Sequence, residues 1–94
     1  MKKRSLEQTR AMKLDFYKQI EAGTIDIRSA SKLMRKIAGL NQHEYAEKIL
    51  KISPRVLIDF ERGVGNPTLK TLQRIASPFG LEVGFIRKKR DATP

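Results

Sequence analysis

The chain has 94 residues, enough for one domain with a modest core and too few for two. It has no cysteine and a single histidine, which excludes a disulfide framework and a thiolate metal site and suggests no cofactor. The net charge of +10 favours a polyanionic partner, nucleic acid ahead of an anionic membrane, although solubility alone also explains some basic proteins. Apolar runs are too short for a membrane span or a signal peptide, so we expect a cytoplasmic protein.

The first segment, residues 1–25, is predicted to hold a basic arm and an additional helix. Residues 2–4 are all basic, as flexible arms that contact phosphates often are. The helix is expected over residues 5–22, with Gly23 ending it. Its apolar stripe recurs every four residues: Met12, Phe16 and Ile20. That stripe is too thin to fold alone, so the helix must dock either on the rest of the domain or on a partner.

The predicted DNA-binding domain, residues 26–80, begins with a helix that ends at Gly39. Apolar residues recur along this helix at helical spacing: Ile27, Ala30, Leu33, Met34 and Ile37. A second helix is expected from Asn41, and its inward residues are Tyr45, Ala46, Ile49 and Leu50. The pattern therefore predicts two amphipathic helices at the start of this domain.

A tight turn at residues 51–53 leads into a third helix of the domain. Ser53 is a favourable N-cap, and Pro54 occupies the first helical position, where a missing N–H costs nothing. Leu57 and Phe60 are expected to face inward, and Gly63 suits a left-handed C-cap. Two helices joined by so short a turn form a helix-turn-helix, in which the second helix reads the major groove of DNA.

The remainder of the chain is predicted to hold one more helix and a short strand. Thr68 caps the helix, which stops near Ala76 because of Pro78, and its inward residues are Leu69, Leu72, Ile75 and Ala76. In residues 81–87 apolar side chains then alternate: Leu81, Val83 and Phe85. An unpaired strand edge is a liability, so these three residues are expected to pair with a second subunit. A basic tail, residues 88–94, follows.

With these residues in place the chain resembles the Xre/Cro-type, lambda-repressor-like helix-turn-helix regulators. The resemblance spans roughly residues 27–86, and its carriers are Gly39-Leu40-Asn41-Gln42, Ala46, Ile52-Ser53, Leu57, Phe60-Glu61-Arg62-Gly63, Asn66-Pro67-Thr68-Leu69 and Leu72. It implies an all-α, lambda-repressor-like bundle that binds double-stranded DNA. The final strand looks like the dimerising strand of HipB-like antitoxins, which implies a toxin kinase as partner and repression of the protein's own operon.

The chain departs from this family at the turn and on the reading helix. The family usually has Gly where this chain has Lys51, and a left-handed Lys costs roughly 1 kcal/mol relative to Gly, which is tolerable. Positions that are often Gln or Ser in relatives are here Pro54, Arg55 and Ile58. The expected reading surface is therefore sparse, and its specificity is either low or dependent on Arg55, on thymine methyl groups and on DNA shape.

Four residues are candidates for reading bases. Arg55 suits a bidentate contact with guanine, against the alternative of a solvated surface Arg. Asp59 can accept from cytosine N4 or hold Arg55 through an (i, i+4) pair, and the second role is favoured because phosphate repels an acid. Pro54 lies beside them. Ile58 faces outward, toward either a thymine methyl group or a partner protein.

Six further residues are candidates for phosphate contacts. They lie at helix starts or in the loop before the last helix: Gln42, Ser53, Arg62, Asn66, Thr68 and Lys70. The alternative is that they serve only as caps, turn residues and polar surface. Glu61 is expected to be structural and to pair with a nearby Arg at the edge of the core.

The sequence contains no catalytic constellation, and no enzyme activity is expected. It has no Ser/His/Asp set and no glycine-rich phosphate loop, and His43 reads as polar surface. The leading interpretation is a homodimeric repressor that binds an inverted-repeat operator. The alternatives are an antitoxin that neutralises a partner toxin and autoregulates its operon, and a non-specific nucleic-acid binder that uses its tails.

Overall fold

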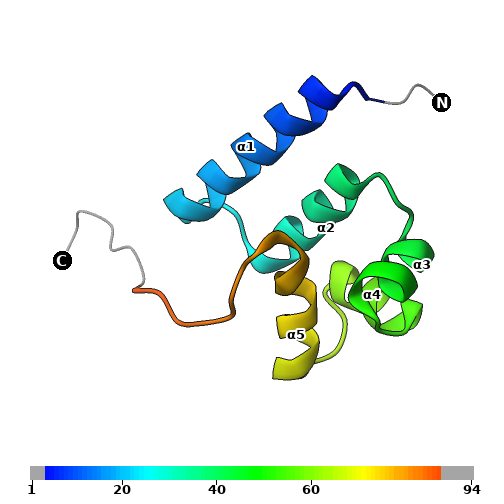
Figure 1. The fold of residues 1–94 in the computed structure, drawn as a ribbon. Coiled ribbons are helices and arrows are strands. Elements are labelled where there is room, and N and C mark those ends of the chain that lie inside the picture. The colour runs from blue at the N-terminus through cyan, green and yellow to red at the C-terminus, as the bar shows by residue number, and fades with distance from the viewer. Residues whose placement is uncertain (1–3, 88–94) are drawn as a thin grey trace.

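The computed structural model describes residues 4–87 and shows a bundle of helices (Figure 1). The elements are α1 (Leu6–Ala22), α2 (Ile27–Ala38), α3 (Gln42–Glu44), the π-helical turn η1 (Tyr45–Leu50), α4 (Pro54–Arg62), α5 (Leu69–Ala76) and the 3₁₀ turn η2 (Ser77–Phe79). The all-α prediction is confirmed. The basic tail and the first three residues of the predicted arm lie outside the described residues. Within that range no helix is long and apolar enough to cross a bilayer.

Helix α2 forms the middle of the bundle. Figure 1 shows α1 along one side of α2, and α3, α4 and α5 on the other side. The core is formed by residues from every α-helix except the short α3, together with η1: Phe16, Ala30, Met34, Ile37, Tyr45, Ala46, Leu50, Leu57, Phe60 and Ile75. The helix-turn-helix unit, α3 and η1 followed by α4, therefore rests on α2.

Helix starts follow the capping residues in the sequence. The N-cap side chains accept a hydrogen bond from the backbone N–H three residues on, which satisfies one of the free donors of the first turn: Ser5, Asp26, Asn41, Ser53 and Thr68. The turn between η1 and α4 is therefore defined by the Ser53 cap rather than being a loose loop. The helix after Thr68 ends at Ala76, before Pro78, as predicted.

The additional helix α1 docks on its own domain. Phe16 is completely buried, and its ring lies 5.6 Å from the ring of Phe79 in an edge-on arrangement. The hydroxyl of Tyr17 donates to the carbonyl of Phe79 at 2.8 Å. These contacts join α1 to η2, so a partner protein is not needed to cover Phe16 in the apolar stripe of α1.

Three residues predicted to face inward are exposed. Ile27 and Leu69 are the first residues of α2 and α5, where the helix projects beyond the packed layer, and Leu69 is 61 % exposed. Ile49 lies in the π-helical turn η1, whose i to i+5 bonding rotates side chains away from the α-helical phase. The prediction of inward-facing residues from a period of 3.6 residues was therefore wrong at two helix starts and in the π-helical turn.

The predicted C-terminal strand is absent from the described chain. Residues 81–87 have no regular secondary structure, and residues 4–87 contain no strand. A strand needs a second extended segment to pair with, and the rest of the described chain is helix and turn. Leu81 and Val83 are half-buried against the domain, whereas Phe85 is fully exposed. The expected pairing of Leu81, Val83 and Phe85 between subunits stays a prediction.

Candidate nucleic-acid interface

Helix α4 presents one face to the core and the other to solvent. Leu57 and Phe60 are buried, whereas the exposed residues of the helix are Arg55, Val56 and Arg62. The start of α4 is fixed because Ser53 Oγ accepts from the N–H of Val56 at 3.2 Å and Pro54 occupies the first turn. Its end is fixed by Gly63 in the left-handed conformation, at φ 77°. An outward face held this firmly can dock in a groove without first becoming ordered.

Arg55 is an exposed charged residue on this face, and Asp59 lies one turn further on. The Nε of Arg55 is 3.6 Å from Oδ2 of Asp59, and the Arg55 side chain is 77 % exposed. This is the (i, i+4) pair that the sequence predicts, and it supports the orienting role of Asp59. The predicted base-reading residues Pro54 and Ile58 are only half-buried, so both retain surface for an outside contact.

Sequence reasoning did not single out Val56, an exposed apolar residue on the outer face of α4. Its side chain is exposed, although it is apolar and lies between Arg55 and the buried Leu57. Val56 and Asp59 line the same shallow pocket of about 160 Å³, which Val64 and Pro67 close on the loop side. The helical register could have identified Val56, because it lies three residues before Asp59 and residues three apart share a face of a helix.

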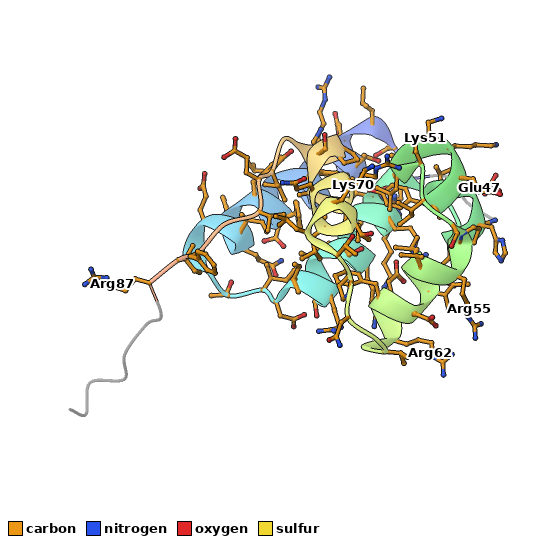
Figure 2. All side chains as sticks on the ribbon, turned by 90° about the horizontal axis from the view of Figure 1, so that it is seen from below. Glu47, Lys51, Arg55, Arg62, Lys70 and Arg87 are labelled. Atoms are coloured by element: carbon orange, nitrogen blue, oxygen red, sulfur yellow. The ribbon has the colours of Figure 1, made fainter. Side chains whose placement is uncertain are left out.

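Four of the phosphate candidates lie exposed around the loop between α4 and α5: Arg62, Asn66, Thr68 and Lys70. Figure 2 shows Arg55, Arg62 and Lys70 on the part of the molecule formed by α4 and α5, whereas Arg87 lies at the opposite end. The hydroxyl of Thr68 donates to Thr71 Oγ1 at 3.0 Å and accepts from the N–H of Thr71. Thr68 therefore serves as the cap of α5, and Arg62 and Lys70 are the exposed cationic residues nearest to it in the chain.

Gln42 belongs to a partly buried polar network that connects α3 and α4 with α2. Glu61 is only 4 % exposed and receives two hydrogen bonds from Arg35, at 3.0 Å and 2.9 Å. Gln42 Nε2 donates to the same carboxylate at 3.0 Å. The structural role predicted for Glu61 is confirmed, and Arg35 is its partner. The amide of Gln42 is thus shared, because one of its two N–H bonds serves Glu61.

Two arginines secure the backbone around α4. Arg74 of α5 donates to the carbonyl of Lys51, the left-handed turn residue at φ 58°. Arg28 of α2 donates from Nε to the carbonyl of Phe60 at 3.1 Å, and its guanidinium lies over the Phe60 ring. Neither contact has a signal in the sequence, since each joins residues from distant elements.

Comparison with known proteins agrees with this geometry. The chain matches the family model described as helix-turn-helix over residues 32–86, which is more than half of its length. No curated protein and no solved structure gives a significant match. The matched range contains the Arg35–Glu61 pair, the Lys51 turn and the exposed face of α4. The chain belongs to the Xre/lambda-repressor-like helix-turn-helix family of DNA-binding transcription regulators.

Proposed function

We propose that the protein is a sequence-specific repressor that acts in the cytoplasm and binds an inverted-repeat operator as a homodimer. The observation that carries this proposal is the exposed, firmly capped outer face of α4, with Arg55 already paired to Asp59. Each subunit inserts α4 in a major groove, and two-fold symmetry places the half-sites about one helical turn, or a multiple of it, apart. Occupying the promoter then blocks transcription.

Base reading on this proposal is centred on Arg55. Its guanidinium donates to O6 and N7 of guanine while Asp59 orients it. Val56 and Ile58 supply apolar contact for thymine methyl groups, and Pro54 lies at the entry of the helix. The phosphate contacts come from both helix starts and the intervening loop: Gln42, Ser53, Arg62, Asn66, Thr68 and Lys70.

Selection of bound sites from random duplex DNA tests the proposal directly. The repressor hypothesis predicts that the selected sites share a palindromic motif. Such a motif would support sequence specificity and two-fold symmetry in one experiment. Arg55→Ala should lose preference at one position of each half-site. Lys70→Ala is the matched control, because removing a phosphate contact weakens all sequences alike. An Arg55→Ala protein that selects the unchanged motif would refute the assignment of α4 contacts.

A second candidate function is that of an antitoxin that neutralises a toxin and represses its own operon. The observation that favours it is a pair of exposed leucines on α1, Leu6 and Leu14, on an element outside the matched DNA-binding region. Co-expression with the product of the adjacent gene tests this role. Restored growth and a co-purifying complex that Leu14→Ser weakens would support it, whereas no complex with either neighbouring product would reject it.

A further inference from the structure

An apolar groove lies at the end of the molecule that carries the C-terminal segment. It has a volume of about 310 Å³, and its walls come from the end of α1, the start of α2, α5 and residues 81–86: Ile20, Ile27, Met34, Leu72, Ile75 and Val83 among them. Figures 1 and 2 both place the C-terminal segment at the end of the molecule opposite α4. A protein docked in this groove would therefore leave the DNA-reading face open.

Phe85 protrudes beside this groove without contributing to it. Leu81 and Val83 turn toward the domain and line the groove, but Phe85 is 107 % exposed and does not line it. Ile27 on the opposite wall is also exposed. One chain thus carries both an incompletely filled apolar groove and an unburied aromatic ring next to it. In a two-fold pair each surface meets its complement on the other copy.

Charges around the groove are complementary in the same sense. Asp26 and Glu82 lie among the lining residues, and Arg87 follows two positions after Phe85 and is exposed. A hydrogen bond from the backbone N–H of Ser29, joined by one from its hydroxyl, lowers the pKa of Asp26, so this carboxylate is charged at neutral pH. A second copy is consequently attracted to this rim although the chain as a whole carries a charge of +10.

We propose that this groove is the dimer interface: Phe85 of each copy fills the groove of the other, and Arg87 approaches Asp26 and Glu82 on its rim. The inference rests on the homodimer of the proposed function and names its surface. Reciprocal insertion of a side chain takes the place of strand pairing, and α1 becomes a wall of the interface through Ile20. The additional helix thereby has a role in assembly.

The oligomeric state of the full chain, without DNA, tests the interface. Phe85→Ser should raise the dimer dissociation constant by about tenfold or more, as truncation of a central aromatic anchor does. Leu14→Ser is the matched control, because Leu14 is an exposed apolar residue of α1 that does not line the groove. Analytical ultracentrifugation measures both constants, and thermal melting of the isolated monomers should be unchanged because neither side chain is buried. A dimer equally strong with Phe85→Ser would overturn the inference.

Crosslinking locates the contact between copies. The chain has no cysteine, so Phe85→Cys in one tagged copy and Ile27→Cys in the other introduce the only thiols. Oxidation of the mixture should give a disulfide between position 85 of one copy and position 27 of the other. A mixture of Leu14→Cys and Phe85→Cys copies should give no such disulfide. Crosslinks between two Phe85→Cys copies, with none to Ile27→Cys, would indicate side-by-side pairing of the segments and overturn groove insertion.

DNA binding separates this inference from the proposed function. A dimer that passes both tests but selects no DNA motif would support the interface and refute the repressor. The opposite result is a chain that remains monomeric at a concentration of about 100 μM, at which a specific dimer should form. If that chain still selects a defined half-site, the interface is refuted and specific DNA binding is retained.

Discussion

At the scale of single residues, Arg55 and Asp59 form an exposed ion pair, and substitutions should separate the roles that we propose for them. Arg55→Lys keeps the charge but loses the bidentate fork, so discrimination at one base pair should fall by about 1–3 kcal/mol while non-specific affinity is retained. Asp59→Asn should also lower discrimination, yet raise non-specific affinity because a carboxylate near phosphate is removed. Titrations with a matched and a mismatched duplex measure both quantities. Equal discrimination in wild type and Arg55→Lys would contradict the base contact.

Tyr45 is a buried residue whose hydroxyl has no hydrogen-bond partner among the described residues. Burial, with the nearby Glu61 carboxylate, raises the pKa of Tyr45 to about 12. Because the folded-state pKa exceeds the unfolded value of about 10, the folded state holds the proton more tightly. The contribution of protonated Tyr45 to the free energy of unfolding is therefore fully present below pH 10. It should be lost as the pH rises from 10 through 12.

Tyr45→Phe should remove this alkaline dependence and stabilise the protein at neutral pH by up to about 1 kcal/mol, since an unsatisfied polar group leaves the core. Urea unfolding at pH 7 and at pH 11 measures the two free energies. Tyr17→Phe is the control, because its hydroxyl donates to Phe79 and its loss should destabilise. A destabilised Tyr45→Phe at pH 7 would show that the hydroxyl is satisfied.

Lys51 carries backbone strain in the turn before α4. It is the only residue other than Gly among residues 4–87 with a positive φ, at 58°. Lys51→Gly should stabilise the fold by roughly 1 kcal/mol because Gly adopts this conformation without a Cβ clash. Lys48→Gly, within η1, should instead destabilise by about the same amount. Thermal unfolding distinguishes the two signs, and a loss of stability in Lys51→Gly would contradict the strain.

At the scale of elements, the Arg35–Glu61–Gln42 network decides how the helix-turn-helix sits on α2. The Glu61 side chain is buried and accepts from both partners. Glu61→Ala should cost up to about 3 kcal/mol, because it leaves the charge of Arg35, whose side chain is 19 % exposed, without its partner. The double variant Arg35→Met with Glu61→Leu should recover much of that loss, since no charge remains. Urea unfolding measures this cycle, and additive losses in the double variant would contradict the pairing.

The contrast between α1 and the C-terminal segment shows what packing adds to an element. Both carry apolar side chains in a regular period, but α1 buries Phe16 completely, whereas the C-terminal segment packs Leu81 and Val83 only partly and leaves Phe85 exposed. Residues 81–87 have no strand to join, so their backbone stays irregular and Phe85 stays in water. A helix satisfies its own backbone hydrogen bonds, whereas a strand depends on a neighbour.

At the scale of the whole molecule, charge should dominate affinity for DNA. A net charge of +10 and cationic residues around α4 and α5 predict release of counterions on binding. If about six phosphates are neutralised, log K should fall with log salt at a slope of about −5. Lys70→Ala should reduce that slope by about one. Binding measured from low to moderate salt tests this, and an affinity independent of salt would refute phosphate contacts.

Local spacing in the sequence predicted the helices, their caps and the Arg55–Asp59 pair, whereas the left-handed conformation of Lys51 was expected from the family resemblance. The helices, the caps and the pair each depend on residues within about one helical turn, where sequence distance and spatial distance agree. The same short spacing also identified the outward face of α4, although Val56 was overlooked on it.

Only the tertiary structure decided which distant groups meet. Tyr17 and Phe79 are 62 residues apart in the chain. The sequence has several arginines that could pair with Glu61, and only the packing shows that Arg35 does. The exposure of Leu69, the missing strand and the groove beside Phe85 likewise depend on where whole elements pack. Packing is set by the shapes of many side chains together, so no local pattern encodes it.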